Sequence, residues 1–436
     1  MLRRLGARSL ALAGVVTVLA GCGAGHSRST APPSPTSSTP SSGGSSKGAG
    51  FDPTPADFRA IRTLLATQAK AVVSGNEKAY LATVDPRQPR LVAQERVLFE
   101  NLTQLDVARL SYAVDDSALV PAHIPGHDPL LRPQVVEHLR ITGTLTKPLS
   151  NPVDLSFVRR DGHWLVGAAS QPKDASHYDS PQERPWYGVP VVARRDGPLT
   201  VIVDKSAAST LGTLSSAIRD GISHDAALLG VPASYRVLVD ATSNGFSYDF
   251  SSVSKQEAAA VTFQLTASDP LGNQVTGLAG TAIKVNPKLV SQVVSDDGIL
   301  RHELTHYLLE QYTGSNPQWL TEGVATWVQY YPDAFSSLQV SAAFYSALMN
   351  ADRTLPSIGL FDTDPNVNYP VSQAAVAWLV ERGGVAKLID LMKAYRTHYQ
   401  GANADALTPQ LIRQVYGVSQ AEVVQGAFAK LAELHH

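Results

Sequence analysis

The chain has 436 residues with a formal net charge of −2 at pH 7, and its pI is near 6.6. A nearly neutral chain lacks the basic surface that binds a polyanion, so a nucleic-acid partner is disfavoured. The length and a hydrophobic content of 44% suffice for two globular domains with real cores.

The N-terminus has the pattern of an export signal. Three arginines precede the apolar residues 10–19, and small residues follow. The apolar run is too short for a confident membrane-spanning helix. It ends in Leu-Ala-Gly-Cys at 19–22, which resembles the lipoprotein box of bacteria, in which the cysteine is acylated. This resemblance implies a signal peptide over 1–22 and a lipid on Cys22 that anchors the protein to the extracytoplasmic face of the cell membrane.

An ordinary secretory signal with an incidental cysteine is the alternative for this segment. Cys22 is the single cysteine of the chain, so no intramolecular disulfide can form. Residues 23–50 consist largely of Ser, Thr, Pro and Gly and cannot bury enough apolar surface to fold. We therefore expect a disordered tether that lets the folded part stand off the membrane.

Residues 51–172 have the pattern of a first domain in which helices precede strands. Helical spacing covers 58–80 and 91–105, and strand alternation covers 108–114, 135–144, 153–159 and 163–167. Helices followed by a curved antiparallel sheet that ends in an Arg-Asp-Gly-x-Trp hairpin resemble the NTF2-like fold. Its histidines are scattered and form no acid–base set, so this domain is predicted to be a spacer or a ligand-sensing module.

Residues 173–190 are polar and rich in Pro, Ser and Asp, and they are predicted to be a linker. The second domain, 191–436, begins with strands and one long helix, and its later part is helical to the end of the chain. Strands are expected at 199–203, 235–239, 260–265 and 280–286, and helices at 206–229, 340–350, 372–382, 385–395, 408–415 and 421–434. The predicted fold class of the whole chain is α+β.

Within the second domain, residues 302–306 read His-Glu-Leu-Thr-His in a stretch that has helical periodicity. In a helix, residues four apart lie on one face, so His302 and His306 can offer their imidazoles to a single metal ion. Glu303 then projects beside that ion, where a general base belongs. Asp296 and Asp297 favour a helix start just before the motif.

A catalytic zinc site needs a third protein ligand, and Glu322 is the candidate. It lies in a second predicted helix with Asn316 as its N-cap and Pro317 at its first position. Because the turn between the helices is short, they should run antiparallel, which brings Glu322 back toward the histidines. Gly323 and Ala325 are small enough to allow close approach of the helices.

The His-Glu-x-x-His motif, together with Trp-Leu-x-Glu-Gly-x-Ala at 319–325, resembles the gluzincin zinc metallopeptidases, in particular their peptidase MA-like branch. The resemblance implies Zn²⁺ bound by His302, His306 and Glu322, with Glu303 as the general base that acts on a zinc-activated water. It also implies an edge strand that pairs with the peptide substrate, for which 282–285 is our candidate. The alternative is a surface helix with polar histidines and a solvated salt bridge at Glu322.

Two further residues, Tyr369 and Thr326, are predicted to assist the zinc site and its reaction. The segment that begins at Tyr369 resembles the Tyr-x-x-Ser…Gly segment of the same branch, which implies that Tyr369 stabilises the oxyanion of the reaction. A tyrosine that packs a helix start is the alternative, and His398 is a rival for the oxyanion role. Thr326 lies four residues beyond Glu322 on the same helical face and is predicted to orient a zinc ligand.

The sequence thus predicts a membrane-anchored, extracytoplasmic zinc peptidase. It has no Gly-x-Met-Glu-Asn element of the kind that aminopeptidases of this group carry, so an endopeptidase is preferred. The alternative is a catalytically inactive, zinc-binding lipoprotein that serves as a binding module at the cell envelope.

Overall fold

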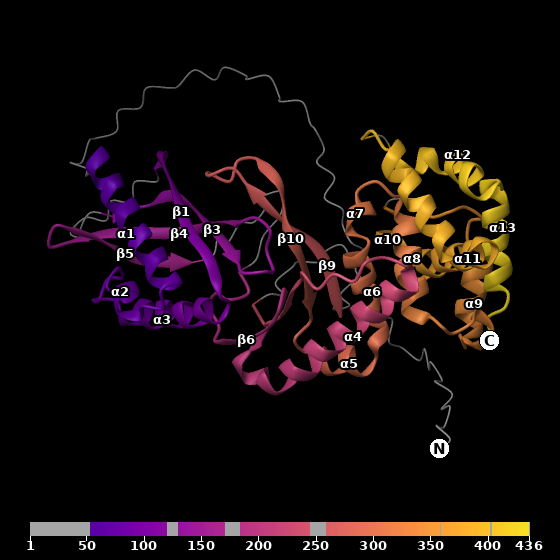
Figure 1. The fold of residues 1–436 in the computed structure, drawn as a ribbon, viewed down its shortest axis with the longest axis horizontal. Helices are drawn as coiled ribbons and strands as arrows, with labels where there is room; N and C mark the ends of the chain where they lie inside the picture. The colour runs from indigo at the N-terminus through magenta and orange to yellow at the C-terminus, as the bar shows by residue number, and fades with distance from the viewer. Residues whose placement is uncertain are drawn as a thin grey trace. The chain divides into compact units, whose positions relative to one another are not determined.

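The computed structural model describes residues 53–119, 130–170, 184–244, 259–357, 359–401 and 403–435. The predicted signal peptide, Cys22 and the tether 23–50 lie outside the described residues. The described ranges form two five-stranded sheets and many helices (Figure 1). This mixture is compatible with the predicted α+β class. No helix in these ranges combines the length and the apolar character that crossing a bilayer requires.

The chain divides into two compact units. Within the described residues, the first unit comprises the chain up to Ala193 together with the segment Gln264–Gly280. The second unit comprises Arg194–Phe263 and the chain from Thr281 onward. The sequence had assigned 264–280 to the second domain, whereas its backbone and side chains bond within the first unit. Thr146, for example, donates a backbone hydrogen bond of 2.8 Å to the carbonyl of Ala279.

The first unit consists of three helices followed by an antiparallel sheet with the order β1-β3-β4-β2, in which β5 pairs with β4. Its elements are α1 (Pro55–Val73), α2 (Glu77–Leu81), α3 (Pro89–Gln104), β1 (Val107–Leu119), β2 (Leu130–Leu131), β3 (Pro133–Ile141), β4 (Leu149–Arg160) and β5 (His163–Ser170). A capping box between Thr54 and Asp57 starts α1. The apolar stripe of α1, with Ile61 and Leu65, packs on the inner face of the sheet.

One row of this inner face is polar. Tyr112, Glu137 and Asn151 lie directly opposite one another on β1, β3 and β4. Glu137 forms a buried ion pair of 2.8 Å with Arg184. Arg184 belongs to the range predicted to be a linker, and the described start of that range, 184–187, is buried in the first unit. Trp186 is fully buried there, and the side-chain amide of Asn101 on α3 donates to its backbone carbonyl at 2.7 Å.

The other sheet has the strand order β6-β7-β8-β10-β9. It belongs to the second unit except for the parts of β6, β9 and β10 that fall before Arg194 or within Gln264–Gly280. The elements of this part of the chain are β6 (Val191–Asp196), β7 (Leu199–Asp204), a 3-10 helix (Lys205–Thr210), α4 (Leu211–Leu229), β8 (Leu238–Ala241), β9 (Ala260–Ser268) and β10 (Val275–Val285). Strands β7, β8 and β10 are parallel neighbours. The last two strands, β10 and β9, form a hairpin that is closed at its base by a hydrogen bond from Asn286 to Ala259.

The prediction that 282–285 is an edge strand is wrong. Ala282 and Lys284 on β10 pair with Leu238 and Asp240 on β8, and β9 pairs with the other side of β10. Both sides of β10 are therefore occupied by neighbouring strands, and β9 takes the edge of the sheet. The strand predicted at 235–239 is the short strand β8, which begins three residues later than predicted. Because β8 pairs with β10, β10 lies inside the sheet.

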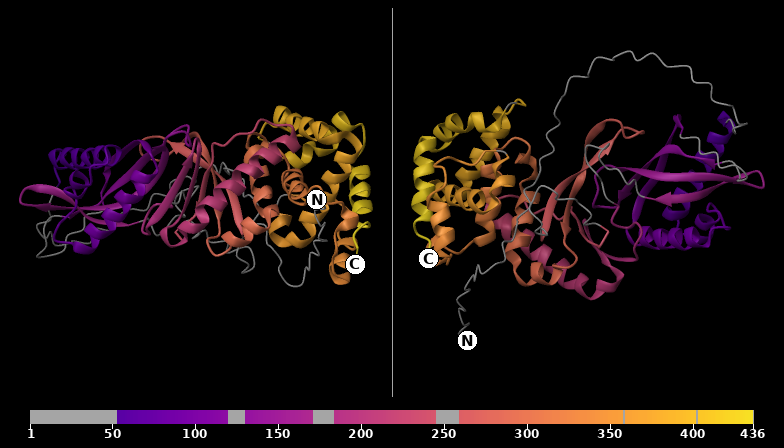
Figure 2. Two further views of the ribbon diagram at one scale, coloured as in Figure 1. Left: turned by 60° about the horizontal axis from the view of Figure 1, so that its bottom comes forward. Right: turned by 180° about the vertical axis from the view of Figure 1, so that it is seen from behind.

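After β10 the described chain is helical, and these helices gather together in the orange-to-yellow part of Figure 2. They are α5 (Val290–Ser295), α6 (Asp297–Leu308), α7 (Glu310–Thr313), α8 (Gln318–Tyr330), α9 (Ala342–Met349), α10 (Leu360–Thr363), α11 (Pro365–His398), α12 (Ala404–Tyr416) and α13 (Gln420–Leu431). Helix α11 joins the two helices predicted at 372–382 and 385–395. Gly384, with φ of +74°, makes a kink where we expected an interruption.

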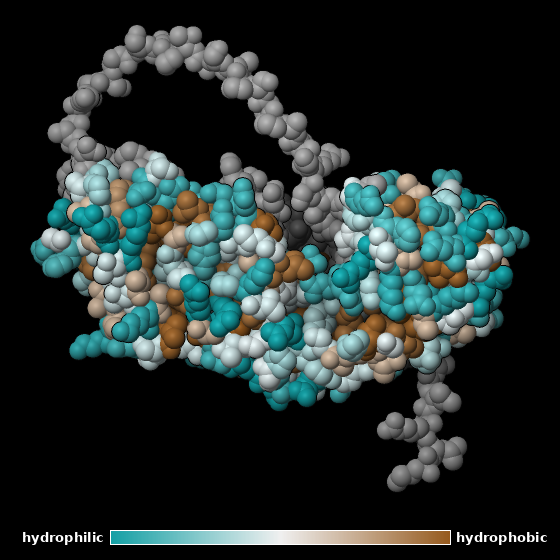
Figure 3. All heavy atoms as spheres, turned by 45° about the horizontal axis from the view of Figure 1, so that its top comes forward, coloured by the Kyte–Doolittle hydropathy of each residue, from teal (hydrophilic) through white to brown (hydrophobic). Residues whose placement is uncertain are grey.

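Hydrophilic and hydrophobic residues are interspersed over the face drawn in Figure 3. The large apolar side chains of the strands and helices described above are mostly buried. This division between a mixed exterior and apolar cores is what the composition of the chain predicts.

Candidate metal centre

Helix α6 carries the His-Glu-x-x-His motif. It begins at Asp296, whose side chain accepts a hydrogen bond from the backbone amide of Gly298, as the acidic residues before the motif predict. On one side α6 packs closely on α4, where a Cβ atom on Gly221 would lie 2.5 Å from Leu304. On another side, Thr262 of the edge strand β9 donates a hydrogen bond of 2.9 Å to the carbonyl of Glu303.

Helix α8 follows after a short connection and runs antiparallel to α6. The start of α6 at Gly298 lies against Gln329, near the end of α8. The prediction of Asn316 as the N-cap is wrong, because Pro317 holds that position and the amide of Asn316 instead donates to the carbonyl of Tyr312 at 2.6 Å. Asn316 therefore closes the preceding turn, and α8 starts one residue later than predicted.

The antiparallel pair brings His302, His306 and Glu322 together. The two Nε2 atoms are 3.1 Å apart, and each lies 3.4 Å from Oε2 of Glu322. One ligand atom from each residue lies within 4.8 Å of the others, and all three side chains are buried. This triad could hold a metal ion. A surface helix with a solvated salt bridge, the alternative considered from the sequence, does not describe these buried residues.

The electrostatics of the triad favour an ionised carboxylate. Burial by itself raises the pKa of Glu322, but the charges of His306 and His302, whose Nε2 atoms lie 3.4 Å from its carboxylate, lower the pKa to about 2. Two imidazole nitrogens and one anionic oxygen therefore face a common point. Such a donor set matches the ligands that catalytic zinc takes from a protein.

Glu303 directly follows His302 in α6 and is fully buried. Neither of its carboxylate oxygens has a hydrogen-bond partner among the described residues. A buried carboxylate without a partner lowers the stability of a fold, so it calls for an explanation.

Tyr369 on α11 also lies close to the triad. Its ring centroid is 6.1 Å from that of His302, and its ring packs edge-on against Phe361 at 5.1 Å. Helix α11 is held against α8 at Gly323, where a Cβ atom would lie 2.6 Å from the backbone oxygen of Ser372. Gly323 thus permits the approach of α11 to α8, whereas the sequence had suggested that it permits the approach of α8 to α6.

The remaining predicted residues are Thr326 and His398. The hydroxyl of Thr326 donates to the backbone carbonyl of Glu322 at 2.8 Å, a bond within α8, and its oxygen can still accept a hydrogen bond. His398 is exposed in the last turn of α11, and its ring contacts the carbonyl of Ala394 in that helix. It is not brought to the buried triad.

Thr262 is a site residue that the sequence analysis missed. It belongs to a strand that was predicted, but its contact with Glu303 joins residues 41 positions apart. No local pattern marks such a contact, because a threonine in a strand has the same appearance whether it faces a helix or solvent.

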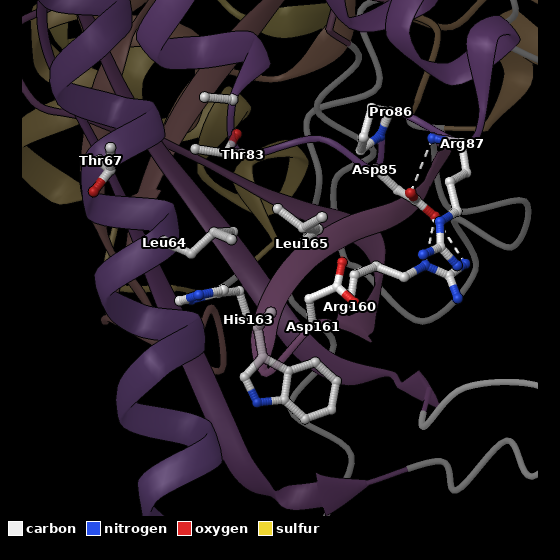
Figure 4. A pocket seen from close by; sticks show the side chains of 12 residues that line it. Leu64, Thr67, Thr83, Asp85, Pro86, Arg87, Arg160, Asp161, His163 and Leu165 are labelled. Atoms are coloured by element: carbon white, nitrogen blue, oxygen red, sulfur yellow. Dashed lines mark hydrogen bonds and ion pairs between the residues drawn. The ribbon is translucent and has the colours of Figure 1, made fainter.

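A separate pocket of about 480 Å³ lies in the first unit, between α1, the end of α2 and β5 (Figure 4). Its buried carboxylate, Asp85, forms an ion pair of 2.9 Å with Arg160 and accepts the backbone amide of Arg87 at 3.0 Å. Burial raises the pKa of Asp85, but these hydrogen bonds lower it below its ordinary value. Asp85 is therefore an ionised structural partner of Arg160.

No protein-family model matches this chain, and neither a curated protein nor a solved structure matches it significantly. The site defined by the geometry is a buried centre of two histidines and one glutamate, with the ring of Tyr369 beside His302 and the buried Glu303 directly after His302 in the chain. The functional assignment therefore depends on these residues and on the motifs that carry them.

Proposed function

We propose that the second unit is a zinc metallopeptidase of the gluzincin type, of the peptidase MA-like branch. The observation that carries this proposal is the convergence of His302, His306 and Glu322, whose ligand atoms lie within 4.8 Å of one another. The two motifs that supply these residues are the ones that define the resemblance. Glu303 adds the base that hydrolysis needs.

Zinc fits the donor set better than the other common protein metals do. Two imidazoles and a single carboxylate suit Zn²⁺, whereas Ca²⁺ and Mg²⁺ prefer sites built of oxygen ligands. When bound by this triad, zinc would supply Lewis acidity to a water molecule and to the scissile carbonyl group.

The reaction steps of the protein itself belong to Glu303 and Tyr369. The carboxylate of Glu303 takes a proton from the attacking water and then passes it to the leaving amine. Its lack of a hydrogen-bond partner among the described residues leaves both oxygens available for that exchange. The phenol of Tyr369 donates a hydrogen bond to the oxyanion that forms on the substrate carbonyl.

The substrate backbone pairs with β9 rather than with 282–285. Strand β9 is an edge of the sheet, and its residue Thr262 bonds directly to the backbone of Glu303. An extended peptide added to such an edge is held by main-chain hydrogen bonds, which fix its register without demanding a particular sequence. This mode of binding supports an endopeptidase.

The cellular setting is part of the same proposal. A lipid on Cys22 anchors the chain to the extracytoplasmic face of the membrane, and residues 23–50 form the tether. The first unit, with helices α1 to α3 followed by an antiparallel sheet, is NTF2-like and acts as a spacer or a ligand-sensing module. The second candidate function is an inactive zinc-binding lipoprotein that acts as a binding module.

The two functions are separated by one experiment on the purified full chain. The peptidase is expected to contain one zinc ion per chain and to cleave unfolded casein. Glu303→Gln, which keeps the size of the side chain, should abolish cleavage and retain the zinc. Zinc binding without cleavage of casein or of a random peptide library supports the binding module, and a wild-type chain that binds no zinc refutes both.

A further inference from the structure

We propose that Arg301 is a positioning residue that holds α6 and α8 in the relative placement the metal ligands require. This inference rests on the proposed function, since it concerns the same metal centre. Arg301 immediately precedes the ligand His302, but its side chain points away to two partners on other segments. Among the described residues, these partners are Asp225 on α4 and the backbone of Tyr331, directly after α8.

The contacts of Arg301 form a clamp inside the second unit. Its Nε atom donates to Oδ1 of Asp225 at 2.9 Å, and its Nη1 atom donates to the carbonyl oxygen of Tyr331 at 2.8 Å. Arg301 is 7% exposed and the carboxylate of Asp225 is fully buried. One guanidinium therefore joins three helices, and its rigid fork fixes the angle between its two partners.

Tyr331 lies directly after α8, the helix that carries Glu322, so the clamp acts on the helix that supplies one of the metal ligands. The last carbonyl groups of a helix have no partner within that helix, and a cation at this end is favoured by the helix dipole. Arg301 donates a hydrogen bond to the carbonyl of Tyr331 and also brings a positive charge to this end of α8. Because α6 and α8 are antiparallel, the clamp meets α8 near its end, while Glu322 meets the imidazoles nearer its start.

Two contacts along α8 constrain the orientation of this helix more than a single contact does. The triad holds α8 at Glu322, and the contact at Tyr331 adds a second polar constraint, near the other end of the helix, that limits its rotation about the first. Metal ligands must be held within roughly 0.5 Å of their productive geometry. The clamp supplies this constraint from the protein side, so the triad is preorganised before a metal binds.

The anchor of the clamp is itself fixed. The same Asp225 oxygen that accepts from Arg301 also contacts Nδ1 of His224 at 3.0 Å. Helix α4 packs against α6 through the close contact of Gly221 with Leu304. Asp225 therefore lies on a helix that packs against α6, and Arg301 connects the end of α8 to this packed pair.

The test measures how fast zinc leaves the full chain when a chromogenic chelator is added in excess. Arg301→Lys keeps the charge but loses the fork, and Asp225→Asn keeps the shape but loses the anion. Loss of a group that orients metal ligands typically weakens metal binding by about ten- to a hundredfold. We therefore expect zinc release to accelerate by about that factor in both variants, with a changed absorption spectrum after Co²⁺ substitution.

Arg219→Gln is the matched control. Arg219 lies on the same helix as Asp225 and forms an ion pair with Asp196, but these side chains are 44% and 37% exposed. Its zinc release should stay within about twofold of wild type, because an exposed pair contributes little.

The melting temperature of each metal-free variant separates positioning from general stability. The proposal is overturned if both variants release zinc within twofold of wild type, or if release accelerates only in proportion to a loss of metal-free stability. Failure of both variants to fold also overturns it, since the clamp would then serve the fold as a whole. Failure of the proposed function is recognised separately, because it appears in wild-type protein as absence of zinc or of cleavage.

Discussion

The hydroxyl group of Thr262 donates a hydrogen bond of 2.9 Å to the backbone carbonyl oxygen of Glu303, and it thereby joins the edge strand β9 to helix α6. The bond is buried, so water does not compete for it. A peptide that pairs with β9 would consequently lie in a fixed register relative to the proposed general base. The first prediction tests this connection.

Replacing Thr262 with valine keeps the shape of the side chain but removes the hydroxyl. We expect kcat for peptide cleavage to fall about three- to tenfold with the zinc content unchanged, because the base shifts relative to the substrate. The free energy of unfolding should fall by about 1 kcal/mol, as for the loss of one hydrogen bond. Thr63→Val, which removes an exposed hydroxyl that bonds to a helix carbonyl, is the control. Equal kcat in both variants would contradict the connection.

The second prediction concerns the pH dependence of metal binding. Protons compete with zinc for the imidazoles of His302 and His306, so affinity falls as the solution becomes acidic. Glu322 takes no part in this competition, because its pKa of about 2 keeps it ionised. A plot of log Kd against pH between pH 4 and 6, from competition with a chelator, should therefore have a slope of two protons at most. A slope near three would show that Glu322 titrates with the histidines.

The lowered pKa of Glu322 also makes the stability of the metal-free protein depend on pH. The pKa of Glu322 in the folded chain lies below the value of about 4.3 expected in an unfolded chain. Its ionised form therefore stabilises the fold above about pH 4.3, and this contribution is lost as the pH falls toward 2. Urea unfolding of the metal-free wild type and of Glu322→Gln should accordingly differ more at pH 5 than at pH 2.5. A difference that does not change with pH would count against this assignment.

The third prediction tests the contact between α8 and α11. A Cβ atom on Gly323 would lie 2.6 Å from the backbone oxygen of Ser372, which cannot move as a side chain can. Gly323→Ala should therefore lower the free energy of unfolding by about 1–3 kcal/mol and reduce zinc affinity, since Glu322 is the preceding residue. In Gly314→Ala the new methyl group meets no atom within 4 Å, so stability should change little. Similar effects in the two variants would refute the steric explanation.

The fourth prediction concerns the buried ion pair of the first unit. Arg184→Met leaves the carboxylate of Glu137 buried without its charged partner, which should cost about 3–5 kcal/mol of stability. Arg96→Met breaks a pair of equal length, 2.8 Å, whose side chains are about half exposed. That change should cost at most about 1 kcal/mol. Chemical denaturation gives the free energy of unfolding of both variants. A loss of stability in Arg184→Met as small as that in Arg96→Met would contradict the prediction.

The sequence by itself determined the features that depend on neighbours along the chain. The spacing of His302 and His306 places both imidazoles on one helix face, because a helix repeats every 3.6 residues. The short connection to the next helix made an antiparallel pair the expected arrangement, and Glu322 arrives at the triad through it. Most helices of the second unit were also predicted from local periodicity, with errors chiefly at their ends.

Only the tertiary structure decided which distant segments meet. Strand β10 has the same alternating pattern whether it lies inside the sheet or at its edge, and the neighbouring β8 is what placed it inside. Likewise, Gly323 is marked as small by its sequence, but the partner that needs its smallness lies on α11. Arg301 reads as a polar residue before a motif until Asp225 and Tyr331 come within 3 Å of it. Contacts of this kind depend on the packing of whole helices and strands, which no local pattern encodes.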